Sequence, residues 1–257
     1  MGRAEARPSD MKIEPLGDSA LIVRVVDDFA ANPDGSVNAV LAAFRCLEAA
    51  GIPGVIELAP AYTTIGVFYD PGRIELSASG QSPFDVIETK IRSVLNAPSF
   101  ENETEIVTPV VEIPVCYGGE LGPDLGDVAR LAGLPEAEVI RRHLSPAYRV
   151  ACVGFIAGFS FLSGLPPELA TPRRATPRKE VPAGSIGIGG AQTGIYPRKS
   201  PGGWNLIGRT PLHLFDVTRD PPATLRAGDR VRFREISRQE FEELSSLPPA
   251  TAAATTT

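Results

Sequence analysis

PRRATPRKEVPAGSIGIGGAQTGIYPRKSPGGWNLIGRTP, residues 172–211, is the stretch that says most about the fold of this chain. It holds the chain's only tryptophan, Trp204, and seven Lys or Arg residues against one acid, Glu180. Its short apolar runs alternate with glycine and proline turns, a pattern typical of a β-barrel or β-sandwich. Ordering so many glycines costs conformational entropy. We therefore expect a rigid basic surface, suited to a phosphate, a carboxylate or an acidic partner.

The flanking sequence extends this β-rich region to residues 110–244. Further short strands are expected at 110–118 and from Tyr148 onward. Two helices separate them: Asp124 is placed to cap the first and Gly133 to end it, and the second runs from 135 to about 145. A short closing helix begins at Arg238, and residues 245–257 are expected to form a disordered tail.

Residues 11–98 predict a separate, small α/β domain. Its expected elements are strands within 13–25 and 55–71 and helices within 37–50 and 82–97. Gly51 is placed to end the first helix, and Ser82 followed by Pro83 to start the second. The order β-β-α-β-β-α indicates helices packed on a small sheet. With residues 1–10 as a disordered tail and 99–109 as a linker, the chain is predicted to be α+β.

Composition and motifs argue against several function classes. The net charge of −6 disfavours general nucleic-acid binding, and no apolar run is long enough to span a bilayer. The charged N-terminus lacks the apolar core of a signal peptide, so a cytoplasmic location is expected. Three widely spaced cysteines and two histidines match neither a disulfide framework nor a metal site, and none is predicted. A P-loop and a GxSxG nucleophile elbow are also absent.

Two arginines of the basic stretch are candidates for binding an anion. The planar guanidinium groups of Arg173 and Arg178 suit a carboxylate or phosphate, although a solvated charged loop is the alternative. The run Gly184–Gly190 is either a β-hairpin or a place where backbone approaches a ligand closely. His143 lies at a predicted helix end, where the helix dipole favours a protonated imidazole.

Aromatic residues offer a second kind of site. Tyr196 and Trp204 either pack the interior of the barrel or line a pocket for a flat ligand. The apolar segment Gly154–Pro166, with three phenylalanines, is either a buried strand with a tight turn or an interface with a partner chain. Because no catalytic triad or carboxylate pair can be assigned, a site completed by another subunit fits better than catalysis by this chain alone.

Several long motifs together resemble one known family. They are GDSAL (17–21), AYTTIGVFYDP (61–71), HLSPAYRVACVGFIAGF (143–159), LATPRRATPRKEVPAGSIGIGGAQTGIYP (169–197) and SPGGWNLIGRTP (200–211). The family is variously called allophanate hydrolase subunit 1, carboxyltransferase domain C/D, sporulation kinase-inhibitor protein and the B-type subunit of 5-oxoprolinase. The likeness covers about residues 11–236. Where the family usually has GFxPGF, this chain has Ala157 in place of the proline.

The resemblance implies a cyclophilin-like β-barrel after the α/β domain. It also implies a partner of related fold, the C-type subunit of 5-oxoprolinase or allophanate hydrolase subunit 2. It further implies a third, A-type subunit and an ATP-dependent opening of 5-oxoproline to glutamate. ATP is then bound by this chain or by a partner. The alternatives are carboxyl transfer in urea degradation and inhibition of a sensor histidine kinase. Neither nucleic acid nor membrane is an expected partner.

The same resemblance points to individual site residues. His143, Arg173, Arg178, Gln192 and Tyr196 match the family pattern, and Gly190 ends the glycine run beside them. The expected roles are that the arginines hold a carboxylate or phosphate, Gln192 and Tyr196 orient an amide, and His143 relays a proton.

Overall fold

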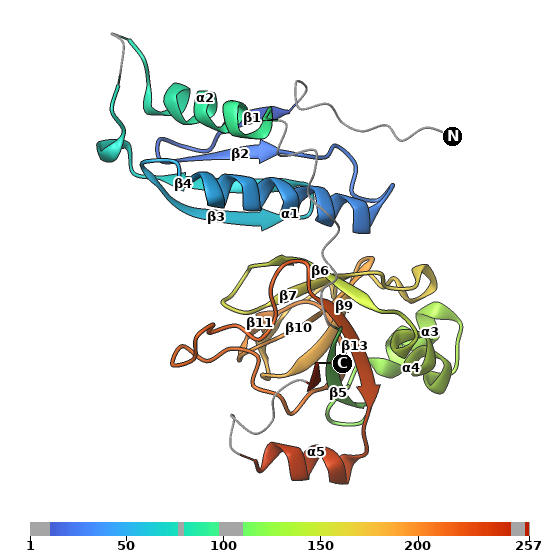
Figure 1. Ribbon diagram of the computed structural model, residues 1–257. Coiled ribbons are helices and arrows are strands. Elements are labelled where there is room, and N and C mark those ends of the chain that lie inside the picture. Colours follow the sequence, from blue (N-terminus) through green and yellow to red (C-terminus); the bar gives the residue numbers. More distant parts are fainter. Residues whose placement is uncertain (1–10, 77–79, 98–109, 248–254, 257) are drawn as a thin grey trace. The chain divides into compact units, whose positions relative to one another are not determined.

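The computed structural model describes residues 11–76, 80–97, 110–247 and 255–256 (Figure 1). The chain divides into two compact units, residues 1–107 and 108–257. The predicted N-terminal tail and the linker at 99–109 lie outside the described residues. No helix in the described part of the chain is long and apolar enough to cross a membrane.

The first unit is a four-stranded antiparallel sheet packed against two helices. Its elements are β1 (Lys12–Pro15), β2 (Ala20–Arg24), α1 (Pro33–Ala50), β3 (Val55–Ala61), β4 (Thr64–Tyr69) and α2 (Pro83–Leu95). The strand order is β1-β2-β4-β3. Alternate strand residues such as Leu21, Val23 and Val67 share one core with Val40 of α1 and Ile87 of α2. The β-β-α-β-β-α order expected from the sequence is therefore present.

The helix ends of this unit follow ordinary capping chemistry. Asn32 accepts a hydrogen bond from the backbone N–H of Gly35, so α1 begins four residues before the predicted start. Gly51 ends α1 in the left-handed conformation, with a φ of 53°. Ser82 and Asp85 form a reciprocal capping box at the start of α2, with Pro83 in the first turn. The signals at Gly51, Ser82 and Pro83 could be recognised in the sequence because capping is a local interaction.

The second unit is built on a closed seven-stranded barrel. Its strands are β5 (Val110–Tyr117), β6 (Tyr148–Val153), β7 (Ser160–Ser163), β9 (Ser185–Gly189), β10 (Gln192–Ile195), β12 (Asn205–Arg209) and β13 (Arg230–Glu235). The ring runs β6-β13-β5-β12-β9-β10-β7, and β7 pairs back with β6. The β5–β13 pair is parallel, whereas the other ladders of the ring are antiparallel. The α+β class with a β-barrel is confirmed.

Smaller elements surround the barrel. They are α3 (Leu125–Ala132), α4 (Glu136–Leu144), α5 (Arg238–Ser245) and a two-stranded sheet of β8 (Arg178–Val181) and β11 (Ser200–Gly202). One prediction needs correction: Asp124 makes no capping hydrogen bond to α3 through its side chain. Most of the expected disordered tail, residues 245–257, lies outside the described residues; within it, β14 (Thr255–Thr256) pairs with β5.

Candidate functional site

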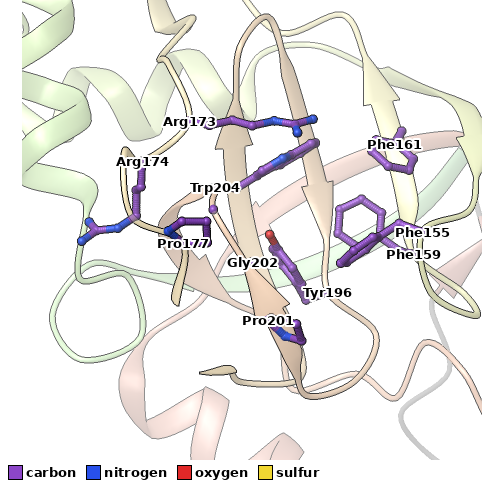
Figure 2. Close-up of a pocket in the computed structure, with 11 residues that line it drawn as sticks. Phe155, Phe159, Phe161, Arg173, Arg174, Pro177, Tyr196, Pro201, Gly202 and Trp204 are labelled. Atoms are coloured by element: carbon purple, nitrogen blue, oxygen red, sulfur yellow. The ribbon is translucent and has the colours of Figure 1, made fainter. Parts of the chain in front are cut away.

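A pocket of about 330 Å³ opens on the second unit, beside the β8–β11 sheet (Figure 2). Its lining combines five aromatic rings, two arginines and a wall of proline and glycine. These residues are Phe155, Phe159, Phe161, Arg173, Arg174, Pro177, Tyr196, Pro201, Gly202, Gly203 and Trp204. Most come from the stretch 172–211 and the rest from the segment after β6. The two regions that stood out in the sequence therefore meet at one site.

Phe159 is the centre of the aromatic wall. Its ring lies edge-on to Phe161, Tyr196 and Trp204, at centroid distances of 4.6, 5.0 and 5.5 Å. Such edge-to-face contacts stabilise aromatic clusters beyond simple burial. Phe155 stands at the rim with 63% of its surface exposed and a φ of 66°, a strained conformation for a non-glycine residue. The wall is thus rigid inside and presents one open ring at its edge.

Glycines make room for the indole of Trp204. A Cβ added to Gly189 would lie 2.6 Å from Trp204 Nε1, and one added to Gly187 would lie 3.0 Å from Trp204 Cβ. The glycine run is a β-hairpin, β9 and β10, with Gly190 at the turn and a φ of 64°. The hairpin interpretation is therefore right, and the close neighbour of these glycines is an indole ring.

Arg173 places an exposed positive charge at the pocket. Its guanidinium carbon lies 5.8 Å from the centre of the Trp204 ring, within the range of a cation–π contact. The residue is exposed, and it forms no ion pair with any carboxylate among the described residues. An anion entering the pocket can therefore reach this group directly.

Tyr196 contributes a buried hydroxyl to the same pocket. Burial raises the pKa of Tyr196, and a hydrogen bond with the Trp204 backbone and the nearby charges of Arg173 and Arg178 oppose the rise only in part. The phenol stays neutral at physiological pH. Gly202 is pressed against it, because a Cβ there would lie 2.5 Å from the Tyr196 hydroxyl.

Arg178 is held by a carboxylate and does not line the pocket. Its Nη2 donates to Asp124 Oδ1 at 2.7 Å, and Arg174 Nη1 donates to the same oxygen at 2.9 Å. The second oxygen, Oδ2, accepts the backbone N–H of Leu206 at 2.7 Å. The sequence-based expectation of a direct ligand contact for Arg178 overlooked Arg174, which lines the pocket. Only the fold shows that two arginines of the run, Arg174 and Arg178, bind Asp124.

His143 lies in the barrel core, away from the pocket lining. The Thr193 hydroxyl donates to the carbonyl of Gly187 at 3.1 Å, so it accepts from His143 Nε2 at 3.0 Å. Nδ1 is then the acceptor for the Tyr117 hydroxyl at 2.8 Å. The ring also stacks on Phe233 at 4.7 Å. Both ring nitrogens are therefore satisfied by neutral partners.

Burial lowers the pKa of His143 to about 3. The expected protonated imidazole is thus wrong, because loss of hydration outweighs the helix dipole at this position. Gln192 begins β10 and Gly190 forms its turn, where Gly190 exchanges two backbone hydrogen bonds with Thr171. Neither residue lines the pocket.

The chain thus combines a small α/β unit with a seven-stranded barrel that carries an arginine-topped aromatic pocket. The chain belongs to the family of the carboxyltransferase domain, subdomain C and D, whose profile matches residues 11–225. This confirms the family resemblance drawn from the sequence.

Individual proteins show which members of this family the chain is similar to. The chain is 43% identical to the B-type subunit of 5-oxoprolinase from Bacillus subtilis over 232 residues, covering 90% of this chain and 95% of that protein. The solved structure of TTHA0988 matches with a TM-score of 0.68 and 36% identity, over 85% of this chain but 40% of that one. The urea carboxylase of Kluyveromyces lactis matches with a TM-score of 0.69 over 91% of this chain and 22% of that one. At 18% identity, that likeness shows a shared fold alone.

Proposed function

We propose that this chain is a non-autonomous subunit of an ATP-dependent 5-oxoprolinase, which opens 5-oxoproline to glutamate together with a paired subunit and a third subunit. The observation that carries the proposal is the pocket, in which the accessible guanidinium of Arg173 lies over aromatic walls. 5-Oxoproline has a carboxylate and a flat five-membered amide ring, and both find a matching surface there. The similarity to the Bacillus subtilis 5-oxoprolinase protein over nearly the full chain supports the same function.

The pocket lining explains why the chain needs partners. Its titratable groups are two arginines and Tyr196, a buried phenol with a raised pKa, so it offers neither a nucleophile–base pair nor a general base poised near neutral pH. The roles that fit are binding the carboxylate at Arg173 and orienting the amide at Tyr196. Groups that activate water or transfer a phosphoryl group must come from another subunit.

ATP does not fit the glycine-rich run of this chain. Gly187 and Gly189 face the indole of Trp204, which occupies the space that a phosphate would need. A phosphate loop also places its backbone N–H groups at a helix start, whereas this run lies in β9. We therefore assign ATP to a partner subunit.

The test is reconstitution with the proposed partner subunits. The assembled complex receives ATP and 5-oxoproline, and glutamate and ADP are measured with each subunit omitted in turn. Glutamate that disappears when this chain alone is left out supports the proposal. An assembled complex that makes no glutamate contradicts it, and carboxybiotin with urea, followed by sensor histidine kinases, would then be tried.

A further inference from the structure

The loop between β6 and β7 holds one aromatic ring out at the rim of the pocket. The backbone N–H of Ile156 donates to the carbonyl of Gly154 at 2.8 Å, so Phe155 is the central residue of a γ-turn. Its φ of 66° belongs to the rare and strained form of that turn. A β-turn follows, in which the N–H of Phe159 donates to the carbonyl of Ile156 at 3.0 Å and Gly158 has a φ of 81°. Two consecutive turns therefore set the position of Phe155.

The loop is fixed to the barrel on both sides of Phe155. The N–H of Gly154 donates to the carbonyl of Phe159 at 3.0 Å, which closes the base of the loop. Gly158 lies against Phe215, because a Cβ added to this glycine would lie 2.8 Å from Phe215 Cβ. The strained turn and the exposure of the apolar Phe155 ring both raise the free energy of the folded state. Strain that the surrounding structure maintains in this way is characteristic of ligand sites.

The ring of Phe155 borders the space in which a ligand would lie. Its aromatic contact within the described part of the chain is an edge-to-face one with Phe159, at a centroid distance of 5.6 Å and an interplanar angle of 85°. Figure 2 shows Phe155 and Pro177 on opposite sides of Tyr196, and all three residues line the pocket. Because Phe155 is 63% exposed, a ligand that enters between these walls can reach its ring.

We infer that Phe155 is a specificity-determining residue, which makes the pocket prefer a planar ring acid to a puckered ring acid of the same charge. A planar ring can lie against the fixed Phe155 ring over its whole face, whereas a puckered ring touches it with only a few atoms. The positive charges of Arg173 and Arg174 attract both acids equally, so they do not contribute to this preference. The inference deepens the proposed function and rests on it only in the choice of 5-oxoproline as one probe.

Trp204 reports binding directly, because it is the only tryptophan and lies in the pocket wall. Its ring contacts are with Phe159 and Phe161, so they remain when Phe155 is replaced. The fluorescence of the full chain is titrated with benzoate, with cyclohexanecarboxylate as the puckered acid of the same charge, and with 5-oxoproline. The wild type should bind benzoate about three- to tenfold tighter than cyclohexanecarboxylate. Phe155→Ala should remove this preference by raising the Kd of benzoate about three- to tenfold, while the Kd of cyclohexanecarboxylate changes by less than about twofold.

Three further variants separate contact with the ring from a change of structure. Phe155→Leu keeps an apolar side chain without a flat ring and should also lose the preference, whereas Phe155→Tyr restores the ring and should recover it. Phe68→Leu is the matched control, because Phe68 is an exposed phenylalanine of β4 that does not line the pocket. Since Phe155 is exposed, its variants should melt within about 3 °C of the wild type.

The inference and the proposed function fail in different ways. Loss of the preference in Phe155→Ala and Phe155→Leu, with its recovery in Phe155→Tyr, supports the inference. An unchanged preference in the first two variants overturns it, as does a wild type that binds benzoate no tighter than cyclohexanecarboxylate. If benzoate follows the expected pattern and 5-oxoproline does not bind, the result counts against the proposed function and leaves the inference supported.

Discussion

Arg173 is the residue on which anion binding by the pocket depends most directly. Arg173→Ala removes a charge-assisted hydrogen bond worth about 1.5–3 kcal/mol, so the Kd of a bound monocarboxylate should rise roughly 10- to 100-fold. Because the side chain is exposed, the free energy of unfolding should change by no more than about 1 kcal/mol, the size of a surface cation–π contact. Titration of Trp204 fluorescence with benzoate and 5-oxoproline measures the first effect and urea unfolding the second.

Arg198→Ala is the matched control for that substitution. Arg198 is also exposed and lies two residues after Tyr196, but it does not line the pocket. Removing the Arg198 guanidinium should leave the Kd within about twofold of the wild-type value. It carries the same charge as the Arg173 guanidinium but lies outside the pocket, where solvent screens it from the ligand. Equal weakening by both substitutions would indicate general electrostatic attraction and contradict a specific site at Arg173.

His143 makes the stability of the barrel unit depend on pH. Its pKa of about 3 in the folded protein lies below the ordinary value of 6.5, so the unfolded chain binds the proton more tightly. The stabilisation is complete above pH 6.5 and is lost as the pH falls from 6.5 toward 3. At pH 5 the loss should be roughly 2 kcal/mol, as one pKa unit corresponds to about 1.4 kcal/mol. Urea unfolding of the wild type at pH 7 and pH 5 measures this difference.

Substitution separates His143 from other titrating groups. His143→Gln removes the imidazole, so the difference in unfolding free energy between pH 7 and pH 5 should shrink by about the same 2 kcal/mol. His213→Gln replaces the other histidine, which is exposed, and should retain the wild-type difference. A wild-type pH dependence that survives in His143→Gln would show that another group causes it.

At the scale of elements, the β9–β10 hairpin shapes the pocket through its glycines. A methyl group at Gly189 would clash with the Trp204 indole. A methyl group at Gly190 would meet no atom within 4 Å, so a substitution there is strained only by the positive φ of the backbone. Gly189→Ala should therefore cost about 1–3 kcal/mol of unfolding free energy and shift the Trp204 emission. Gly190→Ala should cost about 1–2 kcal/mol with the emission unchanged. An identical emission spectrum in both variants would contradict the proposed role of Gly189.

Elements whose ends are set by residues close in the sequence could be predicted from the sequence. The hairpin of Gly184–Gly190, the Ser82 cap of α2 and the Gly133 end of α3 are local features, and all are present. Asp124 shows the limit, because its position before α3 is typical of a cap while its carboxylate is used by arginines about 50 residues later in the chain. Sequence spacing carries no information on such a contact.

The candidate site was partly predictable for the same reason. The chemistry of the basic, aromatic stretch makes Arg173 a candidate for anion binding and Tyr196 and Trp204 candidates for packing the barrel or lining a pocket, and all three line the pocket. The phenylalanines of residues 154–166 join them only because closure of the barrel pairs β7 with both β6 and β10. The expectation that His143 is protonated was wrong, because its position at the end of the helix predicts a favourable dipole, whereas its burial depends on how the helix packs.

At the scale of the whole molecule, each unit has its own hydrophobic core, and both histidines belong to the second unit. Acidification from pH 7 to pH 5 should therefore destabilise the barrel unit and leave the first unit nearly unchanged. Hydrogen exchange followed by mass spectrometry can resolve peptides of α1 and of the barrel strands in the intact chain. We expect a loss of roughly 2 kcal/mol in the opening free energy of the barrel peptides alone, and a fall of about 4–8 °C in the melting temperature reported by Trp204. An equal loss in α1 would mean that the two units unfold as one cooperative structure.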